Sequence, residues 1–191
     1  MFGKLYIYDH SSPEDRAQAE GRFSDDDDVL MVGVNSREDL LAQLNRLVAE
    51  KRYFSRLLIQ THGGPGNIKF DGKPIYDTSL KSNYIRGGFH RLFPLYTRVY
   101  FDGCNVAEGV SGDGFLETFG SIFLRGGGGE VFGWTSAGYG MSVSMFIPPF
   151  LWGHTVHFTG SLKKVYFRPG GVKFNPPAPK VVPIYYGPPP A

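Results

Sequence analysis

Short runs of β-branched and aromatic residues, separated by polar or glycine-rich stretches, divide the first part of the chain. KLYIY (residues 4–8) and DVLMVGV (residues 28–34) predict two strands. The stretch between them is rich in Ser, Asp and Glu, and we interpret it as an exposed loop. Ser36 and Asp39 then form a capping pair for a predicted helix. The apolar face of this helix consists of Leu40, Leu41, Leu44, Leu47 and Val48 at helical spacing.

Two further apolar runs in the centre of the chain end at residues whose side chains could take part in catalysis. RLLIQT (residues 56–61) ends at His62, and TRVYFDG (residues 97–103) ends at Cys104. Both are short and continuous, which is typical of buried parallel strands. Between them, residues 67–76 carry Asp71-Gly72 between two β-like arms and predict a hairpin. A helix over residues 79–93 follows, although it contains Gly87 and Gly88.

The pattern after Cys104 returns to helix and strand. Residues 112–125 predict a helix, and EVFGWTS (residues 130–136) predicts the next strand. A strand pair is expected at residues 155–158 and 164–167. Alternating strands and helices favour an α/β three-layer sandwich, with a mostly parallel sheet and helices on both faces. We expect one domain over residues 1–170 and a proline-rich tail over residues 171–191. The helical face after Cys104 contains Phe115, Leu116, Phe119, Ile122 and Phe123.

Composition and net charge exclude some classes of function. The 191 residues are 41% hydrophobic, as in a folded domain, and 20 basic against 18 acidic residues give a net charge of +2. This charge is too small for a nucleic-acid binder, so no nucleic-acid partner is expected. One cysteine excludes an internal disulfide, and the first residues lack the pattern of a signal peptide. We expect a cytoplasmic protein, or one exported by a route without a classical signal peptide.

His62 and Cys104 form the candidate catalytic pair. Neighbouring parallel strands bring their carboxyl ends to one edge of the sheet, so we expect the imidazole and the thiol to meet there. Gly63 and Gly103 remove side chains where a peptide backbone would approach. A thiolate nucleophile also needs a proton donor and N–H groups that stabilise an oxyanion. His62 and the N–H groups of Gly63 and Cys104 are the candidates for these roles.

The segments LLIQTHGGPGNIKFDG and VYFDGCNVAEG resemble the His-Gly and Gly-Cys segments of the caspase-like (clan CD) cysteine peptidases. This group includes caspases, legumain, clostripain, gingipains and separase. Within it, the chain is most similar to an uncharacterised bacterial domain family found at the N-terminus of large secreted repeat proteins. The similarity covers about residues 57–138. It implies a His62/Cys104 dyad, a protein or peptide substrate, and no obligatory metal or other cofactor.

The resemblance also suggests where substrate binds. In related peptidases the substrate strand pairs with the segment that corresponds here to residues 134–138, so Trp134, Thr135 and Ser136 are candidate pocket residues. Asp102 stands where the family pattern has an uncharged residue. It either lines a pocket for a basic side chain or is buried against backbone donors at the strand end.

Other functions remain open from the sequence. A binding module could keep the caspase-like scaffold without turnover and hold a partner with its proline-rich tail and its apolar segment MFIPPFLW. That segment begins at Met145 and ends at Trp152, and contact of the same segment with a membrane is a third hypothesis. His154 and His157 lack the spacing of a zinc site with Cys104.

Overall fold

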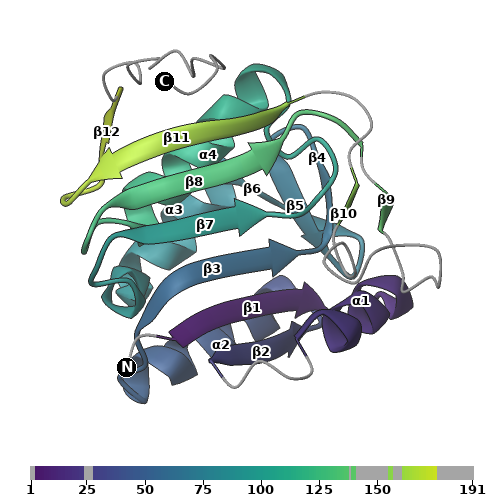
Figure 1. Ribbon diagram of the computed structural model, residues 1–191. Helices are drawn as coiled ribbons and strands as arrows, with labels where there is room; N and C mark the ends of the chain where they lie inside the picture. Colours follow the sequence, from purple (N-terminus) through teal and green to yellow (C-terminus); the bar gives the residue numbers. More distant parts are fainter. Residues whose placement is uncertain (1–2, 24–27, 138, 141–154, 157–160, 176–191) are drawn as a thin grey trace, which may run out of the picture.

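Alternating strands and helices assemble around one central sheet in the computed structural model (Figure 1). Residues 3–23, 28–137, 139–140, 155–156 and 161–175 are described. The central strands are β1 (Gly3–Asp9), β2 (Val29–Val34), β3 (Phe54–Gln60), β7 (Thr97–Phe101), β8 (Gly129–Trp134), β11 (Leu162–Arg168) and β12 (Val172–Phe174). A second sheet contains β4 (His62–Gly64), β5 (Asn67–Phe70) and β6 (Lys73–Tyr76), and β9 (Tyr139–Gly140) pairs with β10 (Thr155–Val156). The helices are α1 (Pro13–Phe23), α2 (Arg37–Ala49), α3 (Asp77–Gly87), the 3-10 helix η1 (Phe89–Leu92) and α4 (Gly109–Phe123).

The central sheet has the strand order β12-β11-β8-β7-β3-β1-β2. Strands β2, β1, β3, β7 and β8 pair in parallel, whereas β11 is antiparallel to both β8 and β12. The mostly parallel α/β sheet predicted from the sequence is confirmed. Because β12 pairs with β11, the sheet extends beyond residue 170, where the sequence placed the end of the domain.

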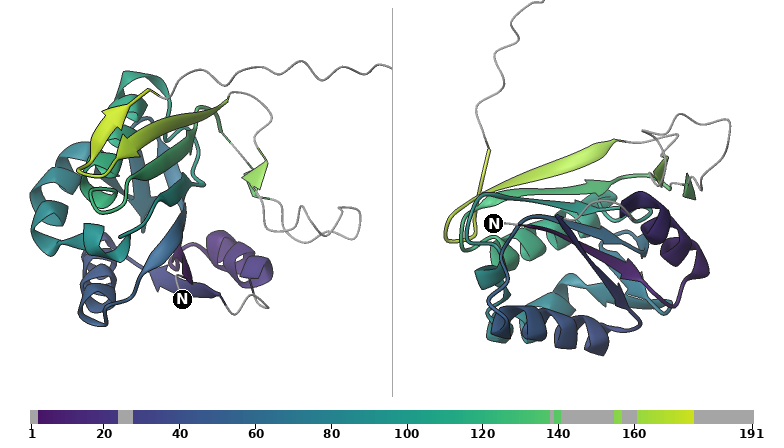
Figure 2. Two further views of the ribbon diagram at one scale, coloured as in Figure 1. Left: turned by 60° about the vertical axis from the view of Figure 1, so that its left-hand side comes forward. Right: turned by 60° about the horizontal axis from the view of Figure 1, so that its bottom comes forward.

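Helices cover both faces of this sheet, in a three-layer sandwich. The strand β2 lies on one side of β1 and β3 on the other, so right-handed crossovers place α1 and α2 on opposite faces. Later crossovers continue in the direction of β3, which puts α3 and α4 on the same face as α2. Of the described helices, α1 is the one on its face, and Figures 1 and 2 show it near the carboxyl ends of β1 and β2.

Phenylalanines form much of the core between the sheet and α4. The ring of Phe101 makes edge contacts with Phe115 and Phe119, at centroid distances of 5.2 and 4.8 Å. The Phe119 ring stacks on Phe123 at 4.1 Å, and Phe123 continues the chain of rings to Phe93. These contacts hold α4 against the carboxyl end of β7, the strand that directly precedes the Cys104 segment.

Two parts of the sequence interpretation are wrong. The stretch expected as an exposed loop after β1 contains α1, and its start is capped because the Asp15 N–H donates to Ser12 Oγ at 3.2 Å. Strands form at both places where a strand pair was expected, as β10 and β11, but within the described residues they do not pair with each other: β10 pairs with β9, while β11 pairs with β8 and β12. Strand pairing depends on tertiary packing, which the local pattern does not contain.

The helix predicted over residues 79–93 is divided. Helix α3 ends at Gly87, and Gly88 has a left-handed φ of 66° before η1 begins. The other predicted helices are confirmed, and the Asp39 N–H donates to Ser36 Oγ at 3.1 Å as the capping pair requires.

Two glycines of α4 should respond in opposite ways to alanine. A side-chain carbon at Gly114 would have no atom within 4 Å, so Gly114→Ala should raise the free energy of unfolding by about 0.5–1 kcal/mol. At Gly120 the same carbon would lie 2.1 Å from the buried Phe167 ring, so Gly120→Ala should lower that free energy by about 1–3 kcal/mol. Urea denaturation of both variants checks the pair. Equal effects would contradict the packing of α4 on β11.

Candidate active site

The carboxyl ends of β3 and β7 lie side by side. Ile59 pairs with Phe101, and the Asp102 N–H donates to the Ile59 carbonyl oxygen at 2.9 Å. His62 begins β4 directly beyond β3 and is exposed, while Cys104 is half-buried in a turn over residues 104–107. The topology therefore brings the His62 and Cys104 segments to one edge of the sheet.

Glycines allow these two segments to touch. A side-chain carbon added at Gly63 would lie 2.6 Å from Val106 Cγ2 and 2.7 Å from the Cys104 carbonyl oxygen. One added at Gly103 would lie 2.8 Å from the Thr61 carbonyl oxygen. Atoms at such distances overlap, so neither position accepts a larger residue without a shift of the backbone. The backbones of the His62 and Cys104 segments are therefore in contact.

The turn after Cys104 is held against the end of β8. The Asn105 N–H donates to the Ser136 carbonyl oxygen at 3.0 Å, and the Ala107 N–H donates to the Trp134 carbonyl oxygen at 2.9 Å. Asn105 has a φ of 57°, a left-handed conformation that asparagine tolerates better than most residues. The turn thus lies between β3 on one side and β8 on the other.

Trp134, Thr135 and Ser136 lie beside the turn that follows Cys104. The first two are half-buried and Ser136 is buried. The Thr135 N–H donates to the Ser161 carbonyl oxygen at 3.1 Å, and the Thr135 hydroxyl exchanges hydrogen bonds with the Ser161 backbone. A substrate strand that paired with the Thr135 N–H would have to displace Ser161.

The strand β4, which begins with His62, is held by the three-stranded sheet of β4, β5 and β6. β4 pairs with β5, and β5 and β6 form the hairpin predicted from Asp71-Gly72, both of which have positive φ. The Asp71 N–H donates to Asp9 Oδ2 at 3.1 Å. Asp9 ends β1 and is buried, so this bond ties the hairpin to the central sheet.

Two polar residues near His62 were missed by the sequence analysis. In the described part of the chain, the buried side-chain oxygens without a hydrogen-bond partner are Asp15 Oδ2 and Asn67 Oδ1. Asn67 pairs with Gly64 across β4 and β5, and Asp15 lies in the first turn of α1. Buried polar atoms are usually satisfied, so these two need an explanation. Ser12-Pro13 followed by Asp15 is a helix-start pattern that could have revealed α1.

Electrostatics link Asp15 to His62. Burial raises the pKa of Asp15 above its ordinary value, and the nearby Asp9 carboxylate also raises it. The charge of His62 opposes burial and lowers the pKa of Asp15, as do hydrogen bonds with Ser12 and Gln60. Burial has the largest effect, so the net shift is upward.

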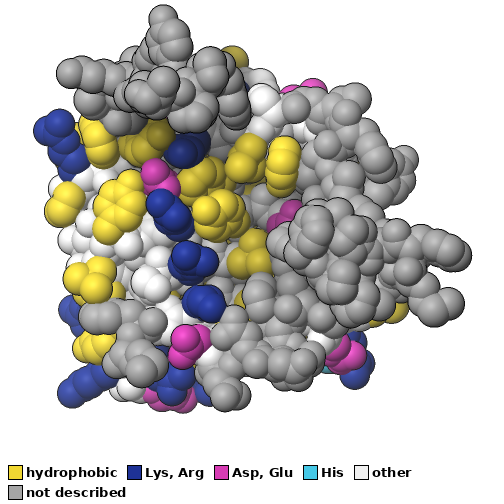
Figure 3. Space-filling model, in the orientation of Figure 1, with side chains coloured by type: hydrophobic (Ala, Val, Ile, Leu, Met, Phe, Trp, Pro, Cys, Tyr) yellow, Lys and Arg dark blue, Asp and Glu magenta, His cyan; other side chains and the backbone are white. Residues whose placement is uncertain are grey.

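One face of the sheet is rich in cations and aromatic rings. Lys4, Arg56 and Arg98 occupy directly paired positions on β1, β3 and β7. They alternate with core residues, so they lie on the face opposite α2 and α4. Arg98 bonds Glu130 at 3.0 Å. Figure 3 shows Lys and Arg side chains crossing this face between hydrophobic ones.

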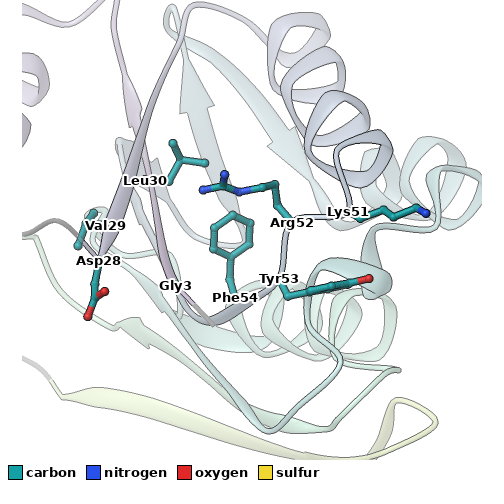
Figure 4. Close-up of a pocket in the computed structure, with 8 residues that line it drawn as sticks. All are labelled: Gly3, Asp28, Val29, Leu30, Lys51, Arg52, Tyr53 and Phe54. Atoms are coloured by element: carbon teal, nitrogen blue, oxygen red, sulfur yellow. The ribbon is translucent and has the colours of Figure 1, made fainter. Parts of the chain in front are cut away.

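A pocket of about 580 Å³ lies at the amino ends of the strands, at the end of the sheet opposite to His62 and Cys104. The view in Figure 4 shows its walls from the starts of β2 and β3 and the segment after α2, with the Arg52 guanidinium reaching towards Leu30. Ligands of parallel sheets bind at the carboxyl ends of the strands, and this pocket is at the amino ends. We therefore do not assign it to the site.

Several residues singled out in the sequence lie outside the described residues. These are the apolar segment from Met145 to Trp152, and His154 and His157. Among the residues that are described, no group of three or more His, Cys, Asp or Glu side chains could hold a metal ion. No helix within the described ranges is long and apolar enough to cross a membrane.

Comparisons with known proteins give one family. The chain has no match among the curated proteins. A family model described as a domain of unknown function (DUF4347) matches residues 20–124, a range that includes both His62 and Cys104. Because this match spans more than half of the chain, the protein belongs to the DUF4347 family.

Proposed function

We propose that the protein is a cysteine peptidase of the caspase-like type, with His62 and Cys104 as its catalytic dyad. The observation that carries this proposal is the contact of Gly63 with the Cys104 carbonyl oxygen at the carboxyl edge of a parallel sheet. The site combines a half-buried thiol, an exposed imidazole and backbone without side chains where a peptide would approach. This combination suits acyl transfer.

The proposed reaction is peptide-bond hydrolysis in two steps. Cys104 Sγ, after giving its proton to His62, attacks the substrate carbonyl carbon while the N–H groups of Gly63 and Cys104 stabilise the oxyanion. The C–N bond breaks, His62 returns its proton to the leaving amine, and a thioester remains on Cys104. Water, deprotonated by His62, then attacks the thioester, which releases the carboxylic acid and restores the thiol.

Asp102 and the end of β8 are the proposed walls of the specificity pocket. Asp102 follows β7 just before the Gly103-Cys104 pair, and its half-buried carboxyl group would favour a basic substrate residue. Trp134 and Ser136 contribute through backbone that already contacts the turn after Cys104. Thr135 is the weakest of the candidates because Ser161 uses both its N–H and its hydroxyl.

The single cysteine makes the test direct. Wild type, His62→Ala and Cys104→Ala are incubated with peptidyl acyloxymethyl ketones that carry Lys, Arg, Asn or Asp at the terminal position, and intact mass is followed. We expect one label on wild type, none on Cys104→Ala, and labelling of His62→Ala slowed by about 100-fold or more. Because His62→Ala keeps the same thiol, it measures unassisted alkylation. Equal rates for wild type and His62→Ala, with both folded, would contradict the proposal.

A binding module without turnover is the second candidate. The observation in its favour is the row of Lys4, Arg56 and Arg98 at directly paired positions on neighbouring strands, which gathers basic side chains on one face of the sheet. Glu130 already pairs with Arg98, so an acidic partner segment would bind chiefly through the exposed Arg56. Inertness of the folded wild type towards every probe, with saturable binding of an acidic peptide that Arg56→Gln weakens, would favour this function over the peptidase.

A further inference from the structure

Strand β2 forms one edge of the central sheet, and its outer side carries backbone groups that no described strand uses. β1 bonds the even-numbered residues of β2; the His10 N–H, for example, donates to the Val34 carbonyl oxygen at 2.9 Å. Backbone groups alternate between the two sides of a strand, so the N–H and C=O groups of Val29, Met31 and Gly33 point away from β1. β2 is therefore open to pairing with one more strand.

β2 lacks the features with which proteins protect an exposed sheet edge. Its sequence is VLMVGV, with no charged residue and no Pro. Long apolar edge strands of this kind pair readily with another strand. The strand at the opposite edge, β12, has only three residues, and one of them is Lys173, which bonds with Glu117. β2 is thus the edge of this sheet that favours pairing.

Helix α2 lies beside this edge and carries charges of opposite sign at its two ends. Asp39, in the first turn, accepts a hydrogen bond from the backbone just beyond β2, and Arg46 lies in the last turn. Bonds from Gln43 to Asp39 and from Arg46 to Gln43 place these three residues on one side of the helix. Leu41 and Val48 pack against the core from the other side. The charged side of α2 therefore adjoins the open edge.

We propose that two copies of this chain associate through β2, paired antiparallel about a two-fold axis that passes between their Met31 residues. Val29 of each copy then lies opposite the partner's Gly33, and Met31 lies opposite the partner's Met31. Such directly opposite residues exchange two hydrogen bonds in an antiparallel ladder, so every outward N–H and C=O group of these residues gains a partner. The two central sheets become one continuous sheet.

The same axis brings the charged sides of the two α2 helices towards each other. β2 and α2 are each about 20 Å long, and they run in opposite directions along the sheet. The rotation therefore places the first turn of one α2 beside the last turn of the other. Asp39 then faces the partner's Arg46, and Arg46 faces the partner's Asp39. This charge complementarity favours a second copy of the chain as the occupant of the edge.

The proposed dimer is independent of the peptidase function. His62 and Cys104 follow β3 and β7, and β1 separates both of these strands from the paired edge. A dimer formed through β2 therefore uses a different part of the sheet from the candidate active site, and either inference can fail without the other.

The mass in solution tests the association directly. Light scattering after size-exclusion chromatography should give wild type twice the chain mass of 21.2 kDa, with a dimer fraction that rises with concentration. Met31→Lys places a charge at the centre of the contact and should give the mass of one chain. Val172→Lys makes a matched change at β12, where the side chain is 60% exposed, and should leave the dimer intact. A single-chain mass for wild type at every concentration, or a dimer that Met31→Lys leaves intact, would overturn the proposal.

Two charge variants test the two-fold arrangement without changing β2. Asp39→Lys would place two cations opposite each other and Arg46→Glu two carboxylates, so the dimer Kd of each variant alone should rise about 10-fold or more. When the two variants are mixed, each altered side chain meets one of opposite charge. Native mass spectrometry should then show mainly dimers with one copy of each variant, and circular dichroism verifies that both are folded. Mixed dimers no more abundant than those of either variant alone would overturn the proposal.

Discussion

Gly63→Ala is expected to lower the labelling rate of Cys104 by about 100-fold while the protein stays folded. The added carbon would lie 2.6 Å from Val106 Cγ2 and 2.7 Å from the Cys104 carbonyl oxygen. One of these atoms is backbone, so the turn over residues 104–107 has to move away from β4. A displacement of about 1 Å in a catalytic constellation can cost roughly 100-fold in rate. Probe labelling followed by intact mass, with circular dichroism to verify folding, measures the effect.

Gly64→Ala is the matched control for Gly63→Ala. It adds the same methyl group to the next residue of β4, but the nearest atom would be the Asn67 side-chain nitrogen at 3.2 Å. That side chain can shift by a few tenths of an ångström without moving the Cys104 turn. We expect Gly64→Ala to label within a few-fold of wild type. If both variants label like wild type, the contact between the two segments does not set the geometry of the proposed dyad.

Phe101→Ala should have the largest effect on stability. The Phe101 side chain is fully buried, and its ring contacts Phe115 and Phe119 of α4. Its removal leaves a cavity between β7 and α4, and such changes cost about 3–5 kcal/mol. Domains are stabilised by only about 5–15 kcal/mol, so the variant should unfold at a much lower urea concentration.

Two control variants define what the Phe101→Ala result means. Phe101→Leu keeps most of the apolar volume and should lose less stability than the alanine variant. Val110→Ala changes a residue of the same helix α4 that is 89% exposed, and should remain within about 0.5 kcal/mol of wild type. A loss below 1 kcal/mol for Phe101→Ala would show that the phenylalanine cluster does not anchor α4 to the sheet.

The sequence predicted the part of the site that lies on regular buried elements. The runs that became β3 and β7 are short, apolar and bounded, so both strands and their parallel pairing followed from the pattern. Because parallel strands end together, the approach of the His62 and Cys104 segments followed as well. The contact of Gly63 with Cys104 could not be predicted in detail, since it depends on how the two turns pack.

The sequence analysis missed Asp15 for a different reason. Its segment is polar throughout, and hydrophobic periodicity, the main signal for a helix, is weak there. α1 forms because Ser12 caps it and because β1 and β2 need a connection on this face of the sheet. The burial of Asp15 comes from that packing, which no local pattern of residues contains. The partners of β10 and β11 were missed for the same reason.

The order of the elements along the chain has a consequence for synthesis of the protein. The residues that form β5, β6, α3 and η1 separate His62 from Cys104, and β8 follows later still. A growing chain therefore presents the imidazole before the thiol exists, and the turn after Cys104 gains its support from Trp134 and Ser136 only after β8 has been made. On the proposed function, proteolytic competence requires the residues up to Ser136, so a growing chain that has not yet reached them is expected to be inactive.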